Sequence, residues 1–142
     1  MGEPVVPGNT VEAYLTFWKR HYSHVRVEDD ECTDKIRANA TQTILLSNGL
    51  LTCFGHHRDI TSGWRPRTVN VLVPGAAIKS NHILGCAVDL EDMDGELDAY
   101  CMANKHVLED FELYLEHPES TIGWCHLQTV PPGSGNRVFR IK

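Results

Sequence analysis

The chain has 142 residues, of which 42% are hydrophobic and 23% are charged, which is ordinary for one globular domain. Its 13 basic and 19 acidic residues give a formal net charge of −6. We find no cluster of Lys and Arg that would neutralise phosphates, and we expect no nucleic-acid partner. We also find no apolar segment suited to membrane insertion and no secretory signal in MGEPVVPGNT, so synthesis in a cytoplasm is expected.

The five cysteines are odd in number, widely spaced, and form no C-x-x-C pair. This pattern argues against a disulfide framework and against a cysteine zinc knuckle. We expect small buried side chains in a reducing compartment. The cysteines are Cys32, Cys53, Cys86, Cys101 and Cys125.

Helices are expected in the first part of the chain. Residues 9–25 carry apolar side chains at three- and four-residue steps, which predicts one amphipathic helix. Asn9 is its expected N-cap, and Glu12 would complete a capping box. A second helix is predicted over residues 33–47, ended by Asn48-Gly49. Together they form a helical lead-in over about residues 9–55.

Strands are expected in the later part, over about residues 58–142. RDITSGW is predicted to be a strand that enters a turn, and RPRTVNVLV a short helix. GCAVDLE is predicted to be a strand with Val88 and Leu90 on one side and Ala87 and Asp89 on the other. A helix over residues 94–111, capped by Asp94, precedes two more strands, in GWCHLQTV and RVFRIK. This order predicts an α+β fold, a small antiparallel sheet packed with helices, in a single domain over residues 1–142.

The stretch KSNHILGCAVDLED suggests a metal site. His82 lies in a loop just before the strand of Asp89, and Gly85 allows the tight turn that would bring them together. A nitrogen and an oxygen donor suit zinc. His126, on a strand-like segment that shares a face with Trp124 and Gln128, is the best third donor. Three protein ligands would leave a fourth position open, as catalytic zinc sites do. The alternative is a strand whose polar face merely carries Asp89.

The other histidines are expected to be solvated or structural. His56 and His57 are adjacent, so on a strand they would point to opposite faces and could not easily share one metal. The remaining members of the set of eight histidines are His21, His24, His106 and His117.

Three blocks, SGWRPRTVN, SNHILGCAVDL and GWCHLQT, carry a resemblance to a known family. They resemble, in the right order, the motifs of the zinc D-Ala-D-Ala carboxypeptidase and L-alanyl-D-glutamate endopeptidase family, which belongs with the hedgehog-like metallopeptidases. The blocks run over residues 62–128, and the PPGSGNRVF tail is similar to small phage-type members. The resemblance implies a hedgehog/DD-peptidase-like fold with His82, Asp89 and His126 as Zn²⁺ ligands.

The resemblance also assigns two substrate-binding residues. Arg65 matches the arginine that binds a carboxylate or carbonyl oxygen of the substrate, a role that suits a guanidinium. Ser80 matches the motif serine, whose hydroxyl could bond near the ligand loop or the substrate. The alternatives are a surface salt bridge for Arg65 and a local loop cap for Ser80.

One position departs from the family pattern. Many relatives carry Glu or Asp three residues before the last histidine as the general base, where this chain has Gly123. Glu116 and Glu119 are the nearest acidic candidates, and Glu116 is preferred because LYLEHP reads as extended. A solvated surface role is the alternative for both.

The resemblance implies a zinc-dependent peptidase that cleaves peptidoglycan stem peptides, as an L-Ala-D-Glu endopeptidase or a D-Ala-D-Ala carboxypeptidase. Similar small chains are phage endolysins or virion-associated hydrolases, so we expect action at the cell wall or periplasm, and virion proteins as further partners. The alternative is a catalytically impaired zinc-binding module of the same fold, which Gly123 would favour.

Overall fold

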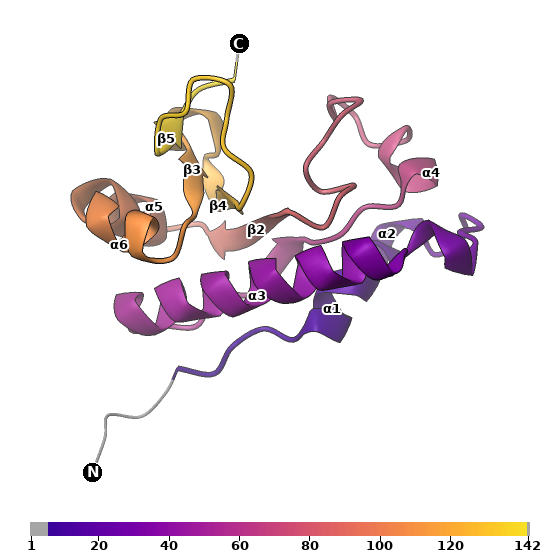
Figure 1. Ribbon diagram of the computed structural model, residues 1–142, viewed down its shortest axis with the longest axis horizontal. Coiled ribbons are helices and arrows are strands. Elements are labelled where there is room, and N and C mark those ends of the chain that lie inside the picture. The colour runs from indigo at the N-terminus through magenta and orange to yellow at the C-terminus, as the bar shows by residue number, and fades with distance from the viewer. Residues whose placement is uncertain (1–5, 142) are drawn as a thin grey trace.

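The computed structural model describes residues 6–141, which are organised by a five-stranded sheet in the order β1-β2-β4-β3-β5 (Figure 1). The strands are β1 (Ile60–Ser62), β2 (Ala87–Asp92), β3 (Tyr114–Glu116), β4 (Gly123–Gln128) and β5 (Val138–Phe139). The α+β class is confirmed. The sheet is mixed rather than wholly antiparallel, because the loop after β4 reverses the chain and passes β3. As a result, β5 pairs with β3 in parallel.

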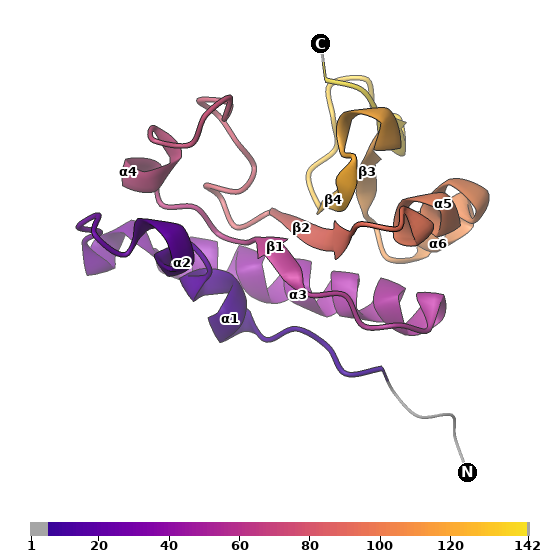
Figure 2. The same cartoon turned by 180° about the vertical axis from the view of Figure 1, so that it is seen from behind.

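The helices gather on one face and at the ends of the sheet. Figures 1 and 2 show α3 running along one face with α1 beside it, α5 and α6 at one end, and α4 at the other. The described helices are α1 (Val11–Thr16), α2 (Lys19–Tyr22), α3 (Asp34–Phe54), α4 (Arg67–Asn70), α5 (Glu96–Ala103) and α6 (Lys105–Asp110), with 3₁₀ turns η1 (Asp29–Glu31) and η2 (Pro118–Ser120). Within residues 6–141, no helix combines the length and the apolar character that crossing a membrane requires.

The predicted single helix over residues 9–25 is wrong, because the chain turns between α1 and α2. The N-cap of α1 is Thr10, whose hydroxyl accepts the amide hydrogen of Ala13 at 3.1 Å. Asn9 instead donates through its side chain to the Arg58 carbonyl at 3.0 Å. The Asn9 side chain, which the local sequence pattern predicted to be the N-cap, therefore makes a tertiary contact instead.

The predicted end of the second helix at Asn48-Gly49 is also wrong. The helix α3 continues to Phe54 and ends at Gly55, whose φ of 95° is the left-handed conformation that suits a glycine C-cap. Gly49 lies inside the helix because the ring of Phe111 packs on it: a Cβ there would be 2.4 Å from Phe111 Cε1. Close packing, rather than helix termination, accounts for this glycine.

The segment over residues 94–111 forms two helices rather than one, with a break at Asn104. Asp94 accepts one amide hydrogen, from Glu96, at 3.0 Å. The stronger cap is Asp92, whose carboxylate accepts the amide hydrogens of Leu97 and Asp98 at 2.9 and 2.8 Å. The start of α5 is therefore fixed directly to the end of β2.

The face of the sheet that meets the helices is the apolar one. In β2, Val88 and Leu90 are fully buried, as the alternation predicted. They join side chains from the neighbouring strands and from α1, α3, α5 and α6 in one core. Its other fully buried members include Tyr14, Ala40, Leu50, Leu51, Leu97, Leu108, Leu113, Leu115, Cys125 and Leu127. The opposite face is left for polar side chains.

Candidate metal centre

Two polar side chains face each other across the centre of the sheet. The pairing of β2 with β4 places Asp89 directly opposite His126. Side chains of cross-strand partners project to the same face, so these two meet on the face away from α3. His126 Nδ1 lies 2.8 Å from Asp89 Oδ1.

A short loop brings His82 to the same place. The Ser80 hydroxyl accepts the amide hydrogen of His82 at 3.1 Å, which is the loop-cap role expected as the alternative. Gly85 has a φ of 77°, and a Cβ there would lie 2.9 Å from the Ile36 carbonyl oxygen in α3. The turn therefore needs glycine, because residue 85 has a left-handed backbone conformation and lies against the backbone of α3.

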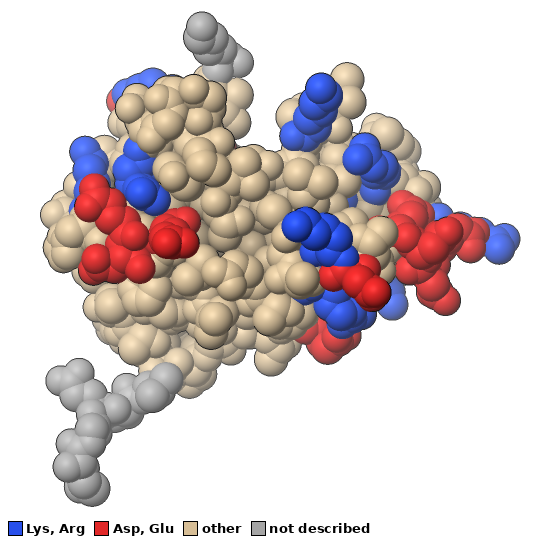
Figure 3. All heavy atoms as spheres, viewed as in Figure 1, with Lys and Arg blue, Asp and Glu red and all other residues tan. Residues whose placement is uncertain are grey.

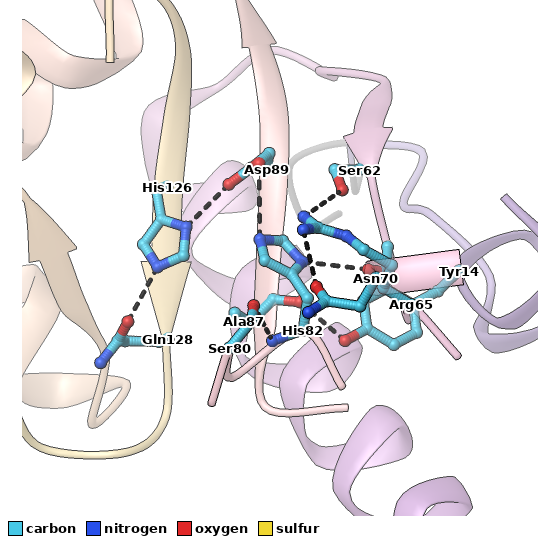
Figure 4. A network of polar contacts seen from close by, with 11 residues as sticks. Tyr14, Ser62, Arg65, Asn70, Ser80, His82, Ala87, Asp89, His126 and Gln128 are labelled. Atoms are coloured by element: carbon cyan, nitrogen blue, oxygen red, sulfur yellow. Dashed lines mark hydrogen bonds and ion pairs between the residues drawn. The ribbon is translucent and has the colours of Figure 1, made fainter. Parts of the chain in front are cut away.

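The three residues that the sequence suggested as ligands form one group. His82 Nε2 lies 3.4 Å from Asp89 Oδ2, and one ligand atom from each of the three residues lies within 4.8 Å of the others (Figure 4). Ligands of a tetrahedral zinc at about 2.0–2.2 Å are themselves about 3.4 Å apart, so small side-chain movements would accommodate the ion. Their side chains are 6–15% exposed, which leaves the group covered but reachable.

Hydrogen bonds fix which nitrogen of each imidazole is free. His82 Nδ1 is 3.0 Å from the Gly63 carbonyl, which can only accept, so Nδ1 carries a proton and Nε2 is the nitrogen left to face Asp89. Gln128 donates through Nε2 to the Val130 carbonyl at 2.8 Å, so its oxygen is the atom that faces His126 Nε2, also at 2.8 Å. His126 Nε2 therefore donates to Gln128, and Nδ1 is the nitrogen that faces Asp89.

The nitrogens that face Asp89, His82 Nε2 and His126 Nδ1, have no other hydrogen-bond partner among the described residues. Without a metal, a proton fills this place: His126 Nδ1 donates to the Asp89 carboxylate, and although burial lowers the pKa of His126, its bonds to Asp89 and Gln128 raise it above its usual value. A bound metal ion would replace this proton between the three residues. Metal-ligating histidines commonly use their second nitrogen to donate to a carbonyl or an amide oxygen. The residues present thus fit a metal with nitrogen and oxygen ligands, held by His82 Nε2, Asp89 and His126 Nδ1.

The electrostatics of Asp89 agree with this reading. Burial would raise the pKa of its carboxyl, but the adjacent His82 and His126 hold that pKa well below its usual range. The carboxylate is therefore ionised at neutral pH, as a metal ligand must be.

The two candidate bases lie in different surroundings. Since Leu115 pairs with Leu127, the next residue of β3, Glu116, comes opposite His126 on the ligand-bearing face. Burial raises the pKa of Glu116, His126 lowers it, and the charge of Asp89 raises it further. Glu119 is exposed and pairs with Arg140 at 2.7 Å, and this partner lowers its pKa. The fold thus brings Glu116 to the group and directs Glu119 to the surface.

The backbone at Gly123 explains why an acidic side chain is absent there. Gly123 begins β4 with a φ of 98°, a conformation that L residues avoid. Space is available, since a Cβ would meet only Met93 Sδ, at 3.5 Å. The departure from the expected pattern therefore coincides with a backbone conformation that suits glycine.

Arg65 lies beside the group, held by polar neighbours. Its guanidinium donates to Asn70 Oδ1 at 3.1 Å and to Ser62 Oγ at 3.3 Å, and its amide donates to the His82 carbonyl at 3.1 Å (Figure 4). Burial lowers the pKa of Arg65, and Asp89 raises it in part. Within residues 6–141 the guanidinium makes no ion pair, so the surface salt bridge considered from the sequence does not form.

The Gly63 carbonyl and the Gln128 side chain, which orient His82 and His126, were not predicted from the sequence. Gln128 shares the face of His126 by strand alternation, so its contact could have been expected from the i, i+2 spacing. The Gly63 carbonyl could not, because a backbone acceptor has no sequence signal. The pair His56 and His57 stays outside the group: His57 contacts Asp59 and the Pro7 carbonyl at 2.8 and 2.7 Å.

Comparison with known proteins identifies a family for this arrangement. No curated protein and no solved structure matches the chain. The peptidase M15 family model matches residues 21–122, a range that includes Arg65, His82, Asp89 and Glu116 and ends just before β4 and His126. The matched range covers most of the chain and carries two of the three metal-site residues, and the fold supplies the third. The chain therefore belongs to the peptidase M15 family, a family of zinc metallopeptidases.

Proposed function

We propose that the protein is a zinc-dependent peptidase that hydrolyses stem peptides of peptidoglycan. The observation that carries the proposal is the convergence of three potential ligand atoms, from His82, Asp89 and His126, while the second nitrogen of each imidazole donates to a carbonyl or amide oxygen. Such a set favours a bound cation, and the family favours zinc. Bound zinc would supply Lewis acidity, which polarises a peptide carbonyl and acidifies a nearby water molecule.

Glu116 is the general base in this proposal. Its carboxylate is half-buried on the ligand-bearing face, and burial raises its pKa toward the working range of a base. Glu116 would take a proton from the attacking water and pass it to the amine that leaves. It must be ionised to do so, so activity should rise as pH passes the pKa of Glu116.

Arg65 would bind an oxygen of the substrate beside the scissile bond. Ser62 and Asn70 hold the guanidinium in place, and a positioned guanidinium can bind a carboxylate with two hydrogen bonds. A cavity of about 120 Å³ next to it is lined by Trp18, Tyr22, Trp64 and Val69, among others. A small apolar group next to a carboxylate, as in an alanine-containing stem peptide, suits this combination. The proposal covers bonds between alanine and D-glutamate and bonds between D-alanines.

The surface agrees with an extended anionic substrate. Figure 3 shows a hollow at the top of the molecule, between the part over β5 and the part over α4, and Lys and Arg side chains on the α4 side. The strands that carry the metal group lie below this hollow in Figure 1. Basic side chains on one wall would attract stem-peptide carboxylates even though the net charge is −6.

The proposed substrate places the site of action at the bacterial cell wall. An enzyme made in a host cytoplasm would reach the wall during phage lysis, and one carried on a phage particle would reach it from outside. We propose a phage endolysin or a virion-associated hydrolase, with virion proteins as partners in the second case. Fractionation of phage particles, followed by immunoblotting, separates the two.

A zinc-binding module without activity is the second candidate, and Gly123 is the observation that favours it. Glu116 weakens this candidate, since a carboxylate is present on the correct face.

Digestion of purified peptidoglycan, followed by mass spectrometry of the fragments, tests the proposal. We expect new amino termini that disappear with a chelator and return with zinc. Wall material left intact by protein that holds one equivalent of zinc would support the module and rule out the peptidase.

A further inference from the structure

Tyr14 connects the two segments that support the metal group, although it lies in α1, outside the range that the family model matches. It is fully buried. Its hydroxyl donates to the Ala87 carbonyl in β2 at 2.7 Å, and its own carbonyl accepts the amide hydrogen of Trp64 at 3.1 Å. Figure 4 shows the hydroxyl beside Ala87, two residues before Asp89.

The contact at the second segment leaves no room for a side chain. A Cβ on Gly63 would lie 2.4 Å from the Tyr14 carbonyl oxygen, so only glycine permits this approach. The carbonyl of the same Gly63 accepts the Nδ1 hydrogen of His82 at 3.0 Å. The position of the Tyr14 backbone therefore sets where the acceptor for His82 lies.

We propose that Tyr14 is a positioning residue for the metal: it holds the backbones of Gly63 and Ala87, and thereby keeps His82 and Asp89 at the separation that one ion requires. The inference rests on the proposed zinc site, but it assigns to α1 a part in that site. Loss of an interaction that orients a ligand typically weakens metal binding by about 10- to 100-fold. We expect a loss of this size when the Tyr14 hydroxyl is removed.

The test is the zinc dissociation constant of folded protein, measured by competition with a chromogenic chelator. Tyr14→Phe should weaken zinc binding at least about 10-fold. It should also change the visible absorption spectrum of the Co²⁺-substituted protein, because the ligand geometry changes. Tyr100→Phe, which removes the hydroxyl of a half-buried tyrosine in α5, should leave both within experimental error.

A second pair of variants separates positioning from general destabilisation. Gly63→Ala would place a Cβ 2.4 Å from the Tyr14 carbonyl oxygen, and Gly49→Ala would place one 2.4 Å from Phe111 Cε1. Gly49 lies in α3, on the face of the sheet away from the metal group. We expect Gly63→Ala to weaken zinc binding at least about 10-fold and Gly49→Ala to lower only thermal stability.

Unchanged zinc affinity in folded Tyr14→Phe would overturn the inference while leaving the proposed function intact. If Tyr14→Phe and Gly63→Ala do not fold, nitrogen NMR of zinc-loaded wild-type protein decides: a proton on His82 Nδ1 supports the link to Gly63, and a proton on Nε2 overturns it. Wild-type protein that binds no zinc overturns the proposed function as well.

Discussion

The two faces of β2 and β4 are built from alternate residues of the same strands, yet they are stabilised in different ways. On the face toward α3, Val88, Leu90 and Leu127 are fully buried and need only matching volume. On the other face, Asp89 and His126 need a partner for each donor and acceptor, and together with His82 they place three ligand atoms where one metal ion could bind. Packing therefore specifies the first face, whereas hydrogen bonds and charge specify the second.

Two buried carboxyl groups show the same contrast. Asp89, on the ligand-bearing face, has a lowered pKa because two imidazoles lie beside it. Asp98, on the helix side, has Oδ1 without a hydrogen-bond partner in the described residues, and burial raises its pKa to about 6. The cationic partners, rather than burial itself, decide whether a carboxylate is stable here.

The largest effect should follow from removing a ligand on the polar face. His82→Ala should abolish stoichiometric zinc binding and wall digestion, a loss greater than the roughly 100-fold expected from an orienting residue alone. Metal content after dialysis, measured by atomic emission, checks this. His57→Ala is the matched control, because His57 is exposed and contacts Asp59. Equal zinc content in His82→Ala and wild type would remove His82 from the site.

Glu116→Gln should lower kcat by about 10²- to 10⁴-fold without loss of zinc, because it removes the proton acceptor but no ligand. Glu119→Gln, a change of the same chemistry at the exposed partner of Arg140, should keep near-full activity. Rates of stem-peptide hydrolysis with zinc-loaded proteins make the comparison. Full activity in Glu116→Gln would show that the base is elsewhere.

The pH dependence of kcat/KM is a second test of Glu116 as the general base. Since burial raises the pKa of Glu116, the ionised base is lost as pH falls through a value above that of a free glutamate, about 4.3. The acid limb of kcat/KM should therefore lie above this value in wild type and in Glu119→Gln. An acid limb that is unchanged in the residual activity of Glu116→Gln would assign it to another group.

A change on the apolar face should act on stability alone. Leu127→Ala should cost about 2–5 kcal/mol of unfolding free energy, because it leaves a cavity in a fully buried site. Urea denaturation measures this cost, and the folded variant should still bind one equivalent of zinc. A loss of zinc from folded Leu127→Ala would show that the two faces are not independent.

Asp98→Asn should have the smallest effect and depend on pH. The raised pKa means that the folded state binds the proton more tightly, so this contribution to stability is present below about pH 4 and is lost as pH rises through about 6. The variant should be more stable than wild type at pH 8 by about 1 kcal/mol, allowing for screening by nearby solvent, and the difference should vanish at pH 4. Thermal unfolding at the two pH values measures it, and an equal difference at both would contradict the assignment.

Sequence patterns predicted the strand faces better than the helix boundaries. Alternation in GCAVDLE correctly placed Asp89 on one face of the strand and Val88 and Leu90 on the other, because side chains alternate between the two faces of a strand. The end of α3 failed at Gly49, where a contact with Phe111 from a distant segment decides the residue. Likewise, the sequence left Glu116 and Glu119 as candidates for the base, because the contact of Glu119 with Arg140 joins separate segments of the chain. The acceptors that orient the two imidazoles, the Gly63 carbonyl and the Gln128 side chain, also depend on the tertiary fold.

The position of zinc in a crystal of zinc-loaded protein, located by anomalous scattering at the zinc absorption edge, tests the central claim most directly. The account predicts one peak within about 2.0–2.2 Å of His82 Nε2, an Asp89 carboxylate oxygen and His126 Nδ1, with Gln128 still bonded to His126 Nε2. A peak bound through His126 Nε2, a peak at another set of residues, or no peak at this group would contradict it.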